Sequence, residues 1–136
     1  MKKWKEDLDH LVSLEYIHFL NVPMKDSKHG PVIDLPSGAL DQMAAVAVIE
    51  HRIPIRGKEV KYLRKVMGLS LEKFAGKMGL SSGTVFHWEK AVHGRLAPVN
   101  EAAVRSLAAE ELGIEIPGKF SLLVGDKIRD VEIKAS

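Results

Sequence analysis

Residues 69–90 read LSLEKFAGKMGLSSGTVFHWEK, which is the pattern of two short helices joined by a tight turn. The Ser70 hydroxyl can accept a hydrogen bond from one of the free amides at the start of the first helix. Gly79 directly follows this helix and can adopt the positive φ that a helix end and a sharp turn require. Apolar residues recur at the spacing of one helix face. These inward positions are Leu71, Phe74, Ala75 and Met78.

The second helix of this stretch is predicted to start at Ser81 or Ser82, because either hydroxyl can cap it. Phe86 and Trp88 are candidates to stack on nucleic-acid bases, but the spacing of Trp88 from Val85 favours packing of Trp88 in the core. The outward positions are small, polar or basic, as a surface that enters the major groove requires. They are Ser82, Gly83, Thr84, His87 and Lys90.

Several short motifs occur together here: Leu63-Arg64, Gly68-Leu69-Ser70, Phe74-Ala75, Gly79-Leu80-Ser81, Thr84-Val85 and Trp88-Glu89-Lys90. With these motifs, the stretch resembles the helix-turn-helix of the Xre-type (lambda-repressor-like) transcriptional regulators. Residues 55–65, IRGKEVKYLRK, lead into it and resemble the same region of antitoxin-type repressors near MqsA and HigA. The resemblance covers about residues 55 to 112.

The resemblance implies that the start and outer face of the second helix read DNA bases. Leu71 stands where the family often has a glutamine that touches phosphate, and His87 stands where a longer basic residue is common. Phosphate binding or base readout is therefore expected either to be weaker or to be redistributed to Lys73, Lys90 and Arg95. Carried over residue by residue, the base-reading positions are Ser81, Ser82, Gly83, Thr84 and His87, and the further DNA-binding residues are Ser70, Lys73, Lys90 and Arg95. The alternative is that all of these are ordinary exposed residues.

The fold expected from these patterns is mainly α. The resemblance implies a lambda-repressor-like DNA-binding domain of four or five helices, in which Arg64 pairs with Glu89. Small β elements are expected in the N-terminal portion, and a β-hairpin at the C-terminus. The predicted elements are a short helix or loose arm over 1–13, strands over 15–22 and 31–35, helices over 37–52, 57–68 and 98–113, and a hairpin over 120–134 that pairs with 15–22 or with a second chain.

The chain of 136 residues suits one domain, or one compact domain with a small appendage. We expect an N-terminal portion over 1–54 for dimerisation or partner binding, a DNA-binding domain over 55–113 and a tail over 114–136. The net charge is +2, but residues 56–95 carry nine Lys or Arg against three Glu, a net of +6. The positive charge therefore lies on the segment proposed to meet DNA, although a solvated charged face would have the same composition.

Other functional classes find little support in the sequence. The six histidines have no metal-ligand spacing, and the absence of cysteine excludes a thiolate zinc site and fits a cytoplasmic protein. No glycine-rich phosphate loop or placed catalytic set is present, so we expect no cofactor and no enzyme activity. No apolar run approaches the length of a membrane span, and we expect no membrane association.

These patterns lead to a sequence-specific DNA-binding repressor that acts as a homodimer on a palindromic operator of double-stranded DNA. An alternative function is that of an antitoxin, in which residues 1–54 cover a toxin protein and DNA binding serves autoregulation. A further alternative is that residues 1–54 bind a small effector, although their residue types indicate no particular ligand.

Overall fold

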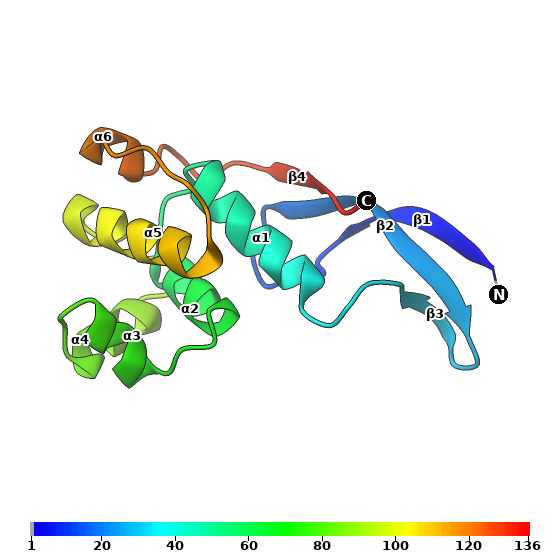
Figure 1. Cartoon of the computed structure of the whole chain (residues 1–136), viewed down its shortest axis with the longest axis horizontal. Coiled ribbons are helices and arrows are strands. Elements are labelled where there is room, and N and C mark those ends of the chain that lie inside the picture. The colour runs from blue at the N-terminus through cyan, green and yellow to red at the C-terminus, as the bar shows by residue number, and fades with distance from the viewer. Residues whose placement is uncertain (1) are drawn as a thin grey trace.

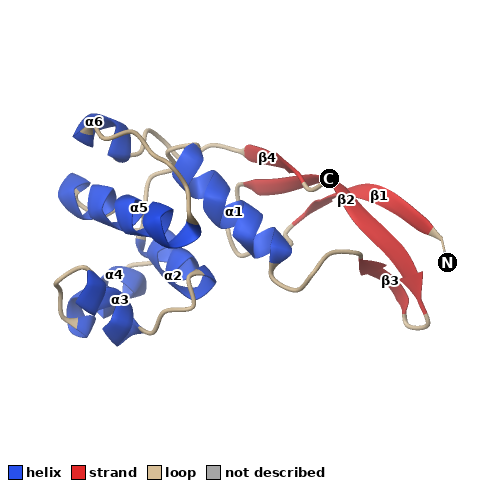
Figure 2. Cartoon of the chain, viewed as in Figure 1, coloured by secondary structure: helices blue, strands red, loops and turns tan. Residues whose placement is uncertain are grey.

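Strands form a sheet at one end of the molecule and helices gather at the other, in the computed structural model that describes residues 2–136 (Figures 1 and 2). The strands are β1 (Lys3–Asp9), β2 (Ile17–Ser27), β3 (Gly30–Ile33) and β4 (Val131–Lys134). The helices are α1 (Ala39–Glu50), α2 (Gly57–Val66), α3 (Leu71–Lys77), α4 (Ser82–Lys90), α5 (Pro98–Leu112) and α6 (Phe120–Leu123).

This mixed α/β architecture corrects the prediction of a mainly α, lambda-repressor-like fold. The four strands belong to one mixed sheet, so the β structure is a layer of the fold and not a minor addition. The prediction failed because it gave weight to the helical periodicity of residues 57–112 and treated the two ends of the chain as appendages. The ends of the chain meet in that sheet, and only tertiary pairing reveals this.

Strand β2 is the centre of the sheet. It pairs with β1 in antiparallel fashion along one side, and with β3 and β4 along the other. The pairing with β1 shifts register between Glu6 and Leu8, and Asn21 on β2 has a φ of 55° there. Such a bulge interrupts the alternation of side chains. Phe19 and Val22 are consequently both buried, which strict alternation would not allow.

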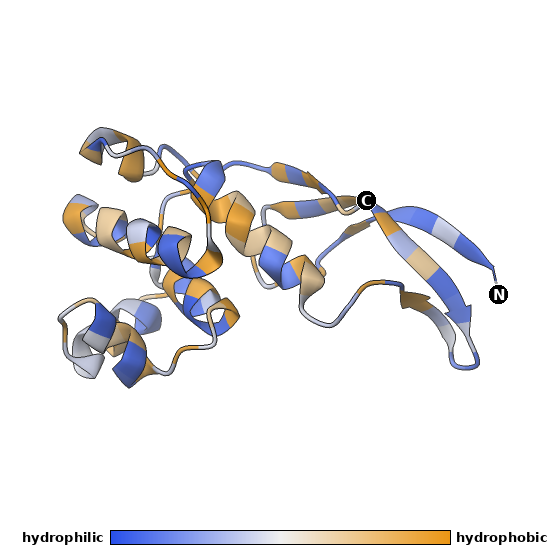
Figure 3. Cartoon of the chain, in the orientation of Figure 1, coloured by the Kyte–Doolittle hydropathy of each residue, from blue (hydrophilic) through white to orange (hydrophobic). Residues whose placement is uncertain are grey.

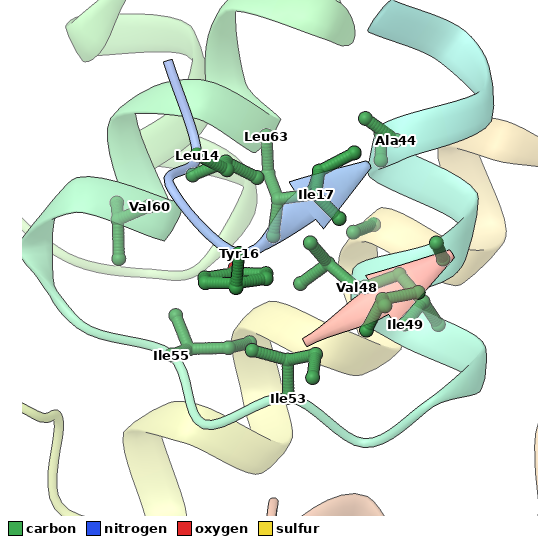
Figure 4. Close-up of a cluster of buried hydrophobic side chains, with 14 of the residues drawn as sticks. Leu14, Tyr16, Ile17, Ala44, Val48, Ile49, Ile53, Ile55, Val60 and Leu63 are labelled. Carbon is green, nitrogen blue, oxygen red and sulfur yellow. The ribbon is translucent and has the colours of Figure 1, made fainter. Parts of the chain in front are cut away.

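One cluster of buried side chains joins the sheet to the helices. Figure 4 shows its centre, where Tyr16, directly before β2, lies among apolar side chains from several elements. The Tyr16 hydroxyl donates a hydrogen bond of 3.0 Å to the buried carboxylate of Glu59 on α2. The labelled neighbours are Leu14, Ile17, Ala44, Val48, Ile49, Ile53, Ile55, Val60 and Leu63. The core therefore spans the predicted N-terminal portion and the predicted DNA-binding domain.

Both ends of the chain differ from their predicted structure. The predicted helix or loose arm over residues 1–13 is wrong, since β1 occupies residues 3–9. The predicted C-terminal hairpin is also wrong: residues 120–123 form α6, and Gly125 is packed against the backbone of Pro54 instead of forming a hairpin turn. The expected pairing of the tail with the first predicted strand is confirmed, because β4 pairs with β2, but in parallel orientation.

Candidate nucleic-acid interface

Helices α3 and α4 are joined by the tight turn that the sequence predicts. The Ser70 hydroxyl accepts a hydrogen bond from the Lys73 amide at 3.2 Å, and Gly79 has a φ of 70° after the end of α3. The Ser81 hydroxyl caps α4 by accepting from the Thr84 amide at 3.2 Å. These caps satisfy amides that a helix start otherwise leaves without partners. The buried side chains that hold the two helices together are Phe74, Ala75 and Val85.

The outward face of α4 carries most of the predicted base-reading positions. Gly83, His87 and Lys90 are exposed, and Ser82 and Thr84 are half-buried. The Thr84 hydroxyl lies 3.0 Å from the Ser81 hydroxyl, so part of its hydrogen-bonding capacity is used within the cap. A hydroxyl is one donor and a double acceptor, which leaves Thr84 capacity for a further contact.

Phe86 lies on the same face, where the sequence left its role open. Its side chain is 51% exposed, and its ring meets the His87 ring edge-on with 6.3 Å between centroids. The position could be found from the sequence, because residues 83, 86, 87 and 90 share one face at helical spacing. A large exposed aromatic side chain thus lies beside His87.

The back of α4 is fixed by an ion pair between Arg64 on α2 and Glu89. The Arg64 Nε lies 2.7 Å from one carboxylate oxygen of Glu89, and a terminal nitrogen lies 2.9 Å from the other. Arg64 also donates a hydrogen bond to the Leu69 carbonyl at 3.0 Å. The hydrogen bond with Glu89 raises the pKa of Arg64. The pairing predicted from the resemblance is present, and its two-point geometry restrains the orientation of α4.

The predicted cationic residues fall into two groups. Lys73 and Lys90 are exposed, and neither forms an ion pair within residues 2–136. Arg95, in contrast, is 3.0 Å from the Glu101 carboxylate and donates to the Gly125 carbonyl at 2.8 Å. Its position is therefore set by contacts inside the protein.

Glu101 is the centre of a buried polar cluster that the sequence analysis missed. Its carboxylate is fully buried and accepts hydrogen bonds from the amides of Ile55 and Gly125 and from the side chain of Arg95. Burial raises the pKa of Glu101, but these hydrogen bonds outweigh burial and hold it below its usual value. Arg105 lies beside it and is likewise buried, and burial lowers its pKa.

A signal for this cluster exists in the sequence. Residues 101 and 105 fall on the same helix face as the apolar residues Val104 and Ala108, so α5 carries two opposite charges on its inward stripe. A charged side chain in such a position is buried only when it is paired. The cluster joins α5 to the segment before α2 and to the tail, and it holds Arg95.

A groove of about 800 Å³ opens between the start of α1, α2 and the end of α4. Three lysines line it at helical spacing on α2. Lys58 is paired with Glu15 at 2.6 Å, whereas Lys61 and Lys65 are exposed. Tyr62 donates a hydrogen bond to Asp41 across the groove. Lys61 and Lys65 therefore place positive charge along this groove.

Comparison with models of protein families, with curated proteins and with solved structures finds no match to this chain. Among residues 2–136, no group of three or more histidine or acidic side chains is arranged to hold a metal ion. None of the helices described above combines the length and the apolar character needed to cross a membrane.

Proposed function

We propose that this protein is a sequence-specific DNA-binding regulator of the Xre type, which represses transcription in the cytoplasm as a homodimer. Helix α4 enters the major groove of DNA, which is about 12 Å wide and therefore admits one α-helix. Thr84 and His87 contact base edges, and Ser81, Ser82 and Gly83 bring the start of the helix close to the bases.

One observation supports this proposal: α4 presents Gly83, Thr84 and His87, with the exposed ring of Phe86 beside them, from a rigid support. Gly83 and His87 are exposed, while Arg64 and Glu89 pair behind them with side chains only 13% and 8% exposed. Readout of bases requires side chains held in a fixed position, because hydrogen bonds weaken steeply with misalignment.

The distribution of charge supports the same function. Residues 56–95 carry a net charge of +6, and Lys73 and Lys90 are exposed on the two helices of the motif. Lysine and arginine that neutralise phosphates supply most of the affinity for DNA that is independent of sequence. The resemblance of residues 55–112 to Xre-type regulators adds support independent of the charge.

A single reading helix contacts only a few base pairs, so a regulator of this kind requires two copies. Paired half-sites one helical turn apart, in a palindromic operator, match a protein dimer with two-fold symmetry. Repression then follows from occlusion of the promoter by the bound dimer.

The experiment that tests the proposal is selection of duplexes from a random library, followed by measurement of affinity by fluorescence anisotropy. The double variant Thr84→Ala with His87→Ala should lose about 1–3 kcal/mol for each good base contact removed. The matched control is His29→Ala, which removes an exposed histidine from the turn between β2 and β3, at the far end of the molecule (Figure 1). Equal affinities of the double variant and the control would show that α4 does not read DNA.

A further inference from the structure

Strand β4 has one edge on β2 and one edge open. The Val131 amide donates to the Tyr16 carbonyl at 2.9 Å, and the Ala135 amide donates to the Leu20 carbonyl at 2.8 Å. Successive residues of a strand direct their backbone groups to opposite edges. The N–H and C=O groups of Glu132 and Lys134 therefore point away from β2. Within residues 2–136, β2 is the one strand that pairs with β4.

The residues of β4, VEIK, alternate between apolar and charged along the strand, as the colours of the ribbon in Figure 3 show. Val131 is buried and Ile133 is partly buried, whereas Glu132 and Lys134 are exposed and take part in no ion pair within the described chain. A groove of about 400 Å³ lies beside the strand. Its apolar lining residues are Met43, Val46, Ala47 and Ile133.

We propose that the open edge of β4 pairs in antiparallel orientation with β4 of a second copy of this chain, with Ile133 on the two-fold axis. The inference rests on the homodimer of the proposed function and assigns its interface. The two sheets then join into one, and the two Ile133 side chains meet beside the groove between α1 and β4.

The direction of the backbone groups limits the possible registers. Only residues with outward-facing groups can form the hydrogen-bonded pairs of an antiparallel ladder, and in β4 these are Glu132 and Lys134. Pairing Glu132 with the partner's Glu132, or Lys134 with the partner's Lys134, places like charges directly opposite, which is destabilising. The remaining register pairs Glu132 with the partner's Lys134 twice, once on each side of the axis. Charge complementarity therefore selects both the occupant and the register.

The outer edge of β1 fits a second copy less well. Its sequence, KWKEDLD, is mostly charged, and its register with β2 is irregular between Glu6 and Leu8. Charged side chains and bulges are the features by which edge strands resist pairing. Strand β4 carries only two charged side chains, which are of opposite sign, and its pairing with β2 shows no register shift.

Cross-linking tests the register directly. The chain contains no cysteine, so Ile133→Cys introduces a single thiol. In a non-hydrogen-bonded antiparallel pair, opposite Cβ atoms lie about 4.5 Å apart, which is close to the distance within a disulfide. Diamide should convert most of the full-length variant into a covalent dimer. The control Ile128→Cys, which is exposed and lies outside the strand, should stay monomeric on a denaturing gel. Equal cross-linking of the two variants would overturn the proposal.

Charge reversal tests the pairing without a cross-link. By sedimentation, Glu132→Lys alone and Lys134→Glu alone should each raise the dimer dissociation constant roughly ten-fold, since two opposite-charge pairs become like-charge pairs. A one-to-one mixture of the two variants should recover the original affinity as a heterodimer. Lys127→Glu, an exposed reversal outside β4, is the matched control and should change nothing.

Two further outcomes overturn the inference: a dimer that neither reversal weakens, and an original chain that stays monomeric at every concentration. Failure of the proposed function is distinguishable from these. Binding of Glu132→Lys to a duplex that holds a single selected half-site reports base reading without dimerisation. If the original chain does not bind the half-site, the proposed DNA binding is wrong, and the sedimentation and cross-linking results still stand.

Discussion

Gly57 at the start of α2 packs directly on the backbone of Trp88 near the end of α4. A Cβ atom at residue 57 would lie 1.9 Å from the Trp88 carbonyl oxygen and 2.5 Å from that of Ala91. The amide of Gly57 also donates to the Gly94 carbonyl at 3.1 Å. This contact and the pair between Arg64 and Glu89 attach α4 to α2 at two points, so the position of the candidate reading helix depends on α2.

Gly57→Ala should therefore lower the free energy of unfolding by about 2 kcal/mol, within the range expected for an overpacked core. The added methyl group meets backbone atoms, which cannot rotate away as a flexible side chain can. Urea denaturation measures the loss, and backbone amide chemical shifts should change most in α4. The control is Gly76→Ala in α3, where a Cβ meets no atom within 4 Å. That change should stabilise the protein by about 0.5–1 kcal/mol, since glycine is unfavourable inside a helix. A Gly57→Ala protein as stable as the original would show that the two helices separate easily.

The helices could be predicted from the sequence because their signals are local. Ser70, Gly79 and Ser81 lie within a few residues of the helix ends that they define, and the apolar spacing of α3 needs no distant partner. The tail gave a false signal. Gly125 and Asp126 have the composition of a hairpin turn, but Gly125 is required by its contact with Pro54, and its amide binds Glu101. Contacts between distant parts of the chain decide that structure, and no local pattern contains them.

The charged residues Glu101 and Arg105 on the inward face of α5 could have been found from the sequence, because they share that face with apolar residues.

Glu101→Ala should lower the free energy of unfolding by about 3–5 kcal/mol, because it leaves Arg105 buried without the carboxylate of Glu101. Glu101→Gln, which keeps an acceptor oxygen in place, should lose less. Urea denaturation compares both with Glu110→Ala, an exposed glutamate on the same helix. If the three variants lose equal stability, the buried cluster does not stabilise the fold.

His18 makes the stability of the sheet dependent on pH. Its Nδ1 lies 2.7 Å from Asp9 and its Nε2 lies 3.1 Å from Asp130, so the ring joins β2 to the end of β1 and to the residue before β4. The hydrogen bond with Asp9, followed by that with Asp130, raises the pKa of His18 above its usual value. The protonated ring therefore stabilises the fold fully below the unfolded pKa of about 6.5, and this contribution disappears as the pH rises through the higher folded value.

Thermal unfolding measured from pH 5 to pH 9 tests this relationship. The original protein should lose stability as the pH rises from about 6 upward, across the interval between the unfolded and the folded pKa. His18→Gln should flatten that slope and leave the rest of the curve unchanged. His29→Gln, at an exposed site, should retain the slope. Identical slopes for the original protein and His18→Gln would mean that another group titrates.

The salt dependence of DNA binding should report how many phosphates α3 and α4 contact. The logarithm of the association constant falls with the logarithm of salt concentration by about 0.9 for each phosphate neutralised on duplex DNA. Lys73→Ala with Lys90→Ala should therefore reduce the slope by roughly 2. Stability should hardly change, because both side chains are exposed and lie in no ion pair among residues 2–136. Lys127→Ala removes one exposed lysine outside the motif and should keep the original slope. An unaltered slope for the double variant would mean that the DNA backbone lies elsewhere on the protein.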